Sequence, residues 1–412
     1  MASGHCHESK IPLICGSDWR AFWSWACPRP PTAPESDVVH QALAIWRPVI
    51  AAALIIFRVK GAIAVADTST VRAMVMTGWG GPEVLQLRSV ASPPAPRAHE
   101  VLVAIKAAGV NPADWMTRSR PIDGYNFGDL SAAMILGLDG SGIVEAVGDQ
   151  VSRFAIGDRV YFLDGGFGSH PGNYQDYKLL HEDVLAHMPT SLSFAEAACV
   201  PTTLVTAWEG LERAGVVSDM TVLVHAGAGG VGHMAVQLAK ARGARVAATV
   251  SGSAKAALAA DLGAELVINY REEDVGATLR AWSGQDGADV VYDTVGGENF
   301  ASSLELVAPY GTVVCCAAFP WPSSDPFPIV MRGAQIVFEN VGLPQILADL
   351  SLRRKQAQIL EQAARMLDDR ILKVAIGGVY PLEQAGAAQS ALEHGRALGR
   401  VVLDLGSVPS AQ

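Results

Sequence analysis

The sequence is poor in cysteine, in basic charge and in long apolar runs. Six cysteines among 412 residues are too few for a disulfide scaffold, so we expect a reducing compartment and a cytoplasmic protein. The 31 basic against 41 acidic residues leave a net charge of −10, which opposes binding to nucleic acid. The apolar run 48–57 is about half as long as a membrane-spanning helix, so we expect no stable membrane insertion.

Residues 1–70 differ from the rest of the chain. They hold four of the nine tryptophans and three of the six cysteines, and their first forty positions have no helical or strand period. The proline-rich run 28–34 interrupts any regular element there. We therefore expect a functionally silent N-terminal extension, either disordered or produced by a wrongly assigned gene start.

A glycine-rich turn follows a strand-like run in the middle of the chain. The stretch 221–232 has the sequence TVLVHAGAGGVG, and a helical pattern over 231–242 and a second strand-like run over 244–250 follow it. This order of elements predicts a dinucleotide site in which Gly227 permits the tight turn and the helix N-terminus holds a diphosphate. The predicted binding residues are Gly227, Ala228, Gly229, Gly230, Val231 and Gly232.

The residues after the second strand indicate the cofactor. Sites for NAD usually place a carboxylate there to hold the ribose 2′-hydroxyl. This chain instead has Ser251, which can donate a hydrogen bond, and Lys255, which can neutralise a 2′-phosphate. The sequence therefore favours NADPH over NADH.

The pattern of short apolar runs predicts an α/β protein with two domains. Runs at 266–270, 289–293 and 312–316 predict parallel strands of a doubly wound sheet. From Val71 to about Ala195, and again near the C-terminus, alternating runs with frequent turns predict a compact antiparallel barrel. We expect a cleft between the two domains. The expected boundaries are 71–197 for the barrel domain, 198–336 for the dinucleotide domain, and 337–412 for the return to the barrel domain.

Several motifs together resemble one enzyme family. They are AGVNPAD at 108–114, GLDGSGIV at 137–144, GDRV at 157–160, the glycine turn, and LGA at 262–264. In this order they resemble the zinc-free quinone oxidoreductase (zeta-crystallin-like) branch of the medium-chain dehydrogenases/reductases, from about Val71 to Leu405. The resemblance implies a GroES-like β-barrel domain, a Rossmann domain, NADPH, a homodimer, and reduction of quinones or activated alkenes.

The zinc ligands of related dehydrogenases are missing. Their cysteine, His-Glu pair and second cysteine correspond here to Asn111, Leu138-Asp139 and Thr202. None of Asn, Leu or Thr replaces a thiolate or an imidazole on zinc, so we predict a site without metal. A hydride acceptor must then be electrophilic already, as a quinone or an α,β-unsaturated carbonyl is.

The resemblance assigns roles to a few polar residues. Asn111 would lie near the nicotinamide and donate to the acceptor oxygen, and Tyr125 is the candidate second catalytic group. Thr206 would bind the cofactor near its nicotinamide end, and Tyr270 would pack beside the adenosine end with Lys255. Two other activities stay open: an enoyl-thioester reductase, and an NADPH-binding protein with little turnover.

Overall fold

The fold is described by a computed structural model for residues 70–120, 134–166, 170–317, 327–395 and 397–406. The expected N-terminal extension, apart from Thr70, and the candidate catalytic residue Tyr125 lie outside the described residues. Among the residues within these ranges, no helix is both long enough and apolar enough to cross a membrane.

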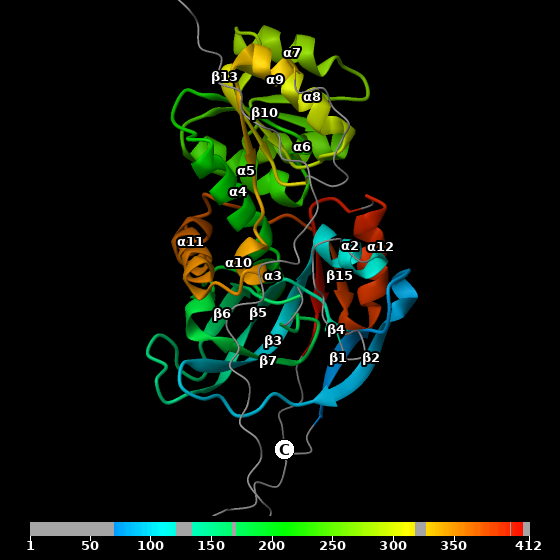
Figure 1. Ribbon diagram of the computed structural model, residues 1–412, viewed down its shortest axis with the longest axis vertical. Coiled ribbons are helices and arrows are strands. Elements are labelled where there is room, and N and C mark those ends of the chain that lie inside the picture. The colour runs from blue at the N-terminus through cyan, green and yellow to red at the C-terminus, as the bar shows by residue number, and fades with distance from the viewer. Residues whose placement is uncertain (1–69, 121–133, 167–169, 318–326, 396, 407–412) are drawn as a thin grey trace, which may run out of the picture. The chain divides into compact units, whose positions relative to one another are not determined.

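Two β-sheets form the barrel part of the chain (Figure 1). Their strands are β1 Thr70–Met76, β2 Leu85–Ala91, β3 Glu100–Val110, β4 Met134–Ile135, β5 Asp139–Val147, β6 Arg159–Leu163, β7 Tyr177–His181, β8 Leu185–His187, β15 Ile376–Pro381 and β16 Arg400–Asp404. The larger sheet has the order β15-β16-β3-β5-β6-β8, with β7 also paired to β3, and the smaller has the order β2-β1-β4. The C-terminal strand β16 thus lies beside β3, which carries the AGVN motif at its end.

Within the residues that the structure describes, five helices accompany these sheets. They are α2 Pro112–Ser119, α3 Phe194–Ala198, α10 Leu343–Ile346, α11 Leu350–Asp368 and α12 Ala385–Glu393. Three short 3-10 turns cover Pro82–Val84, Glu182–Val184 and Leu382–Gln384. Helix α11 begins at Leu350, because Asp349 caps it by accepting hydrogen bonds from the backbone N–H groups of Ser351 and Leu352.

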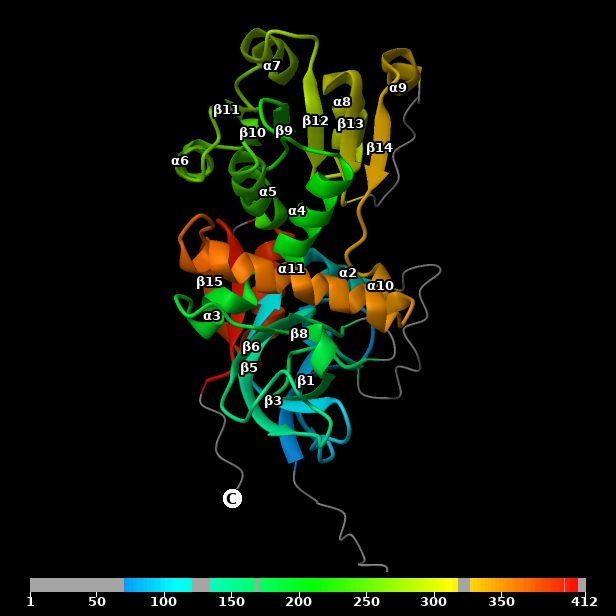
Figure 2. The same cartoon turned by 90° about the vertical axis from the view of Figure 1, so that its left-hand side faces the viewer.

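The dinucleotide part is a six-stranded parallel sheet with helices around it (Figure 2). Its strands are β9 Thr221–Val224, β10 Arg245–Val250, β11 Leu266–Asn269, β12 Ala288–Asp293, β13 Val307–Cys315 and β14 Gln335–Phe338. Its helices are α4 Pro201–Arg213, α5 Gly230–Ala241, α6 Ser253–Asp261, α7 Val275–Ser283, α8 Glu298–Leu306 and α9 Phe327–Arg332. The strand order β11-β10-β9-β12-β13-β14 reverses direction between β9 and β12, the point at which doubly wound sheets bind ligands.

The predicted fold class is confirmed, with one difference in the barrel part. Its strand pairs are antiparallel as expected, except that β15 and β16 run parallel. A parallel pair needs a crossover connection, and α12 supplies it between these two strands. The crossover delivers Arg400, the first residue of β16, next to the end of β3.

Apolar side chains form one core in the barrel and one on each face of the parallel sheet. The barrel core contains Val103, Ile105 and Phe162. One face of the parallel sheet buries Val222 and Val224, whereas the other buries Leu223 and its neighbours. This alternation along β9 follows from the two-residue period of a strand covered on both faces.

A pair of carboxyl groups lies where the chain leaves the parallel sheet. Glu339 follows β14, and its side chain is hydrogen bonded to that of Glu209 on α4. Arg213, one turn along α4, donates to the Phe338 carbonyl at 2.7 Å and to Glu339 Oε2 at 2.8 Å. Burial, and then the neighbouring Glu339 charge, raise the pKa of Glu209 from 4.5 to about 7. One proton is therefore shared between the two carboxyl groups under mildly acidic conditions.

We predict that this pair makes stability fall with rising pH near neutrality. Because the pKa of Glu209 is higher in the folded state, its stabilising contribution is complete below about pH 4.5 and is lost as the pH rises through about 7. Between pH 5 and 8, the unfolding free energy of Glu209→Gln should fall by about 1–3 kcal/mol less than that of the wild type. Urea denaturation at several pH values measures this, with Glu212→Gln on the exposed side of α4 as the control; equal pH profiles for wild type and Glu209→Gln would contradict the prediction.

Candidate active site

The glycine turn connects β9 to α5 at the carboxyl edge of the parallel sheet. The residue with a left-handed backbone is Ala226, at φ +53°, and Gly227 has no positive φ. Gly227 is needed for space instead, because a Cβ there would lie 2.6 Å from the Cβ of Ala248. Gly227 thus permits the turn through its lack of a side chain and not through a positive φ: the left-handed residue is Ala226, and the glycine lets the turn lie close to β10.

A cavity of about 710 Å³ opens beside this turn. It is lined by Ala228 and Gly229 from the turn, by Ser251 and Lys255 after β10, and by Tyr270 after β11. The five residues come from three separate segments of the chain, and all five were predicted from the sequence to bind the cofactor. Ala397, from the return to the barrel part, also lines the cavity.

The remaining predicted cofactor residues do not line the cavity. Gly230, Val231 and Gly232 form the first turn of α5, next to it. Thr206 is buried in α4, and its hydroxyl donates to the Thr202 carbonyl at 2.6 Å. The hydroxyl oxygen of Thr206 therefore keeps only its acceptor capacity for a cofactor.

His225, immediately before the turn, is buried, and its Nδ1 lies 3.2 Å from Thr249 Oγ1. Burial lowers the pKa of His225, so its ring is neutral at pH 7.

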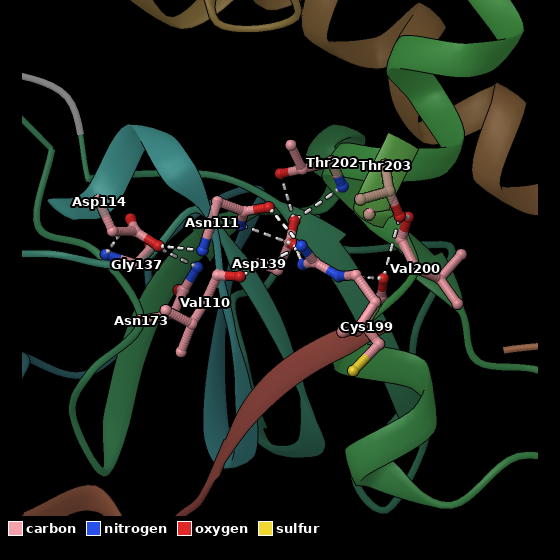
Figure 3. A network of polar contacts seen from close by, with 12 residues as sticks. Val110, Asn111, Asp114, Gly137, Asp139, Asn173, Cys199, Val200, Thr202 and Thr203 are labelled. Carbon is pink, nitrogen blue, oxygen red and sulfur yellow. Dashed lines mark hydrogen bonds and ion pairs between the residues drawn. The ribbon is translucent and has the colours of Figure 1, made fainter. Parts of the chain in front are cut away.

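The three positions that match the zinc ligands of related enzymes meet in one network (Figure 3). Asn111 Nδ2 donates to Asp139 Oδ2 at 2.9 Å. The backbone N–H and the hydroxyl of Thr202 donate to Asp139 Oδ1 at 2.8 and 2.5 Å. Asn111 and Thr202 thus share one carboxylate, which is fully buried.

Arg400 completes this network. Its Nη2 donates to Asp139 Oδ2 at 2.8 Å, its Nη1 donates to Asn111 Oδ1 at 2.9 Å, and its Nε donates to the Cys199 carbonyl at 3.0 Å. A Cβ on Gly230 would lie 3.5 Å from Arg400 Nη1, so the guanidinium is next to the glycine turn as well. The fixed positive charge therefore lies between the barrel residues and the start of α5.

The backbone around Asn111 is fixed by a second carboxyl group. Asp114 Oδ2 accepts hydrogen bonds from the Asn111 backbone N–H at 2.7 Å and from the Tyr174 hydroxyl at 3.0 Å, and Oδ1 accepts from the Gly137 N–H at 3.2 Å. Burial raises the pKa of Asp114 to about 7, against the effect of these donors. Asp114 therefore fixes the orientation of the loop that carries Asn111.

These donor groups do not fit a zinc ion. Asn111 and Thr202 are neither thiolate nor imidazole, and both donate hydrogen bonds to Asp139 instead of offering lone pairs to a metal. The Arg400 guanidinium beside them would also repel a second cation. Within the described ranges, no group of three or more His, Cys, Asp and Glu side chains is arranged to hold a metal ion.

Sequence reasoning missed Arg400. A signal was present, since an arginine opens the apolar run RVVLD of the last strand, where a charged side chain must find a partner if it is buried. The identity of that partner was not accessible, because Asp139 is 261 positions away in the chain.

Comparisons with known proteins fit this architecture. The description "Alcohol dehydrogenase GroES-like domain" matches residues 97–210, and "Zinc-binding dehydrogenase" matches residues 230–344. A quinone oxidoreductase from Sus scrofa is 32% identical over 333 residues, which are 79% of this chain and 95% of the relative. The chain belongs to the quinone oxidoreductase branch of the medium-chain dehydrogenases/reductases.

Of two further relatives, one is named for its substrate and the other for a bound cofactor. A 2-methylene-furan-3-one reductase from Solanum lycopersicum is 33% identical, and the match covers 82% of this chain and 82% of that protein. The solved structure of a mycobacterial protein complexed with NADPH has a TM-score of 0.69 and 31% identity, and the match covers 81% of this chain and 99% of that one. The chain thus shares its fold with a protein solved with NADPH and with one titled an NAD-dependent alcohol dehydrogenase, which supports a nicotinamide cofactor.

We predict that Lys255 distinguishes the two nicotinamide cofactors. Lys255→Ala should raise the Michaelis constant for NADPH about ten- to hundred-fold and leave that for NADH nearly unchanged, because a charged hydrogen bond to the 2′-phosphate is lost. Steady-state kinetics with each cofactor measures both Michaelis constants. Lys355→Ala, on the exposed side of α11, is the control variant. An equal loss with both cofactors would contradict the assignment.

Proposed function

We propose that the protein is an NADPH-dependent reductase that transfers hydride to a quinone or an α,β-unsaturated carbonyl without zinc. The main support is the combination of a cavity lined by Ser251 and Lys255 with a polar network in which Asn111 and Thr202 replace metal ligands. The names of the pig and tomato relatives agree with this pair of acceptor classes.

The preference for NADPH is proposed from charge and space in the cavity. Lys255 brings a positive charge and Ser251 a hydrogen-bond donor to the end of β10, where the segment 251–255 contains no carboxylate. A 2′-phosphate would be neutralised there, whereas a free ribose hydroxyl would lack its usual acidic partner. Tyr270 lines the same cavity and offers a ring against the adenosine end.

In the proposed reaction the chain orients the acceptor and stabilises negative charge on its oxygen. NADPH, when bound, supplies the hydride. Asn111 has one amide hydrogen beyond the one given to Asp139, and this N–H is the group that we propose for the acceptor oxygen. An acceptor whose charge spreads over a conjugated system needs no metal to reach this state.

We propose that the protein is a homodimer joined along β14. This strand ends the parallel sheet, and among the described residues only β13 pairs with it. Ile336 and Phe338 on β14 are 36% and 40% exposed, and Tyr310 on β13 is 86% exposed. An edge strand with partly exposed apolar side chains favours pairing with a second copy of the same strand around a twofold axis.

Sedimentation analysis tests the dimer. Ile336→Asp should convert a dimer into a monomer, because it places charge on the shared edge, whereas Val217→Asp, at an apolar position that is 58% exposed after α4, should not. A wild-type protein that sediments as a monomer, or a dimer that Ile336→Asp leaves intact, would contradict this interface.

We propose that the protein is located in the cytoplasm. Cys199, Cys315 and Cys316 are free thiols, and the first two are buried, as expected of an enzyme that works in a reducing compartment.

The activity is tested with a panel of acceptors. We expect NADPH oxidation with 9,10-phenanthrenequinone, 1,4-benzoquinone or an enone, with no zinc by elemental analysis and no effect of chelators. Turnover with crotonyl-CoA alone would favour an enoyl-thioester reductase, and binding of NADPH without turnover on any acceptor would favour the binding protein.

The panel also tests the two catalytic candidates. Asn111→Ala should lower turnover about 100- to 1000-fold if its amide is the sole oxyanion donor, with little change in the NADPH dissociation constant. Tyr125→Phe should have a smaller effect, confined to enones, because quinone products can take protons from water. If Asn111→Ala had normal turnover and Tyr125→Phe had none on any acceptor, the two roles would be reversed.

A further inference from the structure

The side chain of Asn111 is held at both ends of its amide. Its Oδ1 accepts from Arg400 Nη1 at 2.9 Å, and its Nδ2 donates to Asp139 Oδ2 at 2.9 Å. If the amide were turned over, its NH₂ group would face the guanidinium and its oxygen would face the carboxylate. Both contacts would be repulsive, so the hydrogen-bond partners alone determine which way the amide points.

The two groups that hold Asn111 are themselves fixed by other elements. Besides Asn111 and Asp139, the Arg400 guanidinium donates to the carbonyl oxygens of Val110 and Cys199 at 3.1 and 3.0 Å. Asp139 is held from the other side by the backbone and hydroxyl of Thr202 (Figure 3). Arg400 and Asp139 are 2% and 0% exposed, so water does not compete for these contacts.

The arrangement has a consequence for the one amide hydrogen that is left. A cationic donor on Oδ1 withdraws electron density from the amide and strengthens its N–H as a donor. The fixed orientation also prevents Nδ2 from exchanging places with the oxygen, which would present a lone pair to an incoming oxyanion. Both effects favour charge on an acceptor oxygen near Asn111.

We propose that Arg400, together with Asp139, is a positioning residue that orients and polarises the Asn111 amide for the acceptor oxygen. This role rests on the proposed function, since it assumes that Asn111 meets the acceptor. Arg400 acts through Asn111 and does not itself touch the acceptor.

A double-mutant cycle on kcat at saturating NADPH tests this role. Arg400→Lys keeps the charge but loses the forked geometry, and it should lower kcat about ten-fold in the wild-type background. In the Asn111→Ala background the same change should lower kcat less than about two-fold, because the group through which it acts is gone. Equal fold-changes in both backgrounds would overturn the proposal.

The orientation is also measured without any cofactor. In protein labelled with ¹⁵N at asparagine, the Nδ2 resonance that disappears in Asn111→Ala should shift in Arg400→Lys and in Asp139→Asn. Arg118→Lys is the matched control, because Arg118 is equally buried, at 1% exposed, but its ion pair is with Glu393 and not with Asp139. An Asn111 resonance that is unchanged in every Arg400 and Asp139 variant that folds would overturn the proposal.

The two arms separate this inference from the proposed function. A wild-type protein that fails to oxidise NADPH with every acceptor tested would contradict the proposed function. The resonance of Asn111 would still test the orientation of its amide. An active wild type whose Arg400 and Asn111 effects multiply would contradict the positioning role and leave the reductase activity in place. Binding of NADPH, measured by fluorescence, shows whether Arg400→Lys also weakens the cofactor site beside Gly230.

Discussion

The buried ion pair between Asp139 and Arg400 is the contact on which the candidate site depends. The two side chains meet at 2.8 Å, and between them they bond Asn111, Thr202 and the carbonyl of Cys199. Asp139 and Arg400 are the first residues of β5 and β16, Asn111 follows β3, and Thr202 lies at the beginning of α4, so one pair connects the barrel to the helix that leads into the parallel sheet. Removing either partner would leave an unpaired buried charge, a defect that typically costs about 3–5 kcal/mol.

Much of the fold, and the residues that line the cavity that we propose for the cofactor, could be predicted from local sequence patterns. The order of strand, glycine turn, helix and strand is encoded within about thirty residues, and the dinucleotide site it predicts needs only that local order. Ser251 and Lys255 were found for the same reason, because they follow directly after β10. The barrel was predicted from alternating runs, although the parallel pairing of β15 with β16 was not, since strand direction depends on the connection made by α12.

The acceptor side of the site was only partly predictable. Asn111 and Asp114 were recognised from one motif, and their contact spans three residues. The partners Asp139 and Arg400 come together only when β3 pairs with both β5 and β16, which no local pattern encodes. The folded topology determines which distant charged groups pair, so the partner of Asp139 could not be predicted from a single sequence. The place of Tyr125 stays a prediction, because it lies outside the described residues.

The left-handed backbone of Ala226 has a consequence for the rigidity of the cofactor turn. An alanine in this conformation is less stable than a glycine by about 1–2 kcal/mol in the folded state. The same methyl group restricts the unfolded chain, which returns about 0.4–1 kcal/mol on folding. The second term offsets only about half of the first, so the alanine makes the turn stiffer at a net cost of roughly 0.5–1 kcal/mol. A glycine at this position would stabilise the protein by about that amount but would let the turn sample many more backbone states.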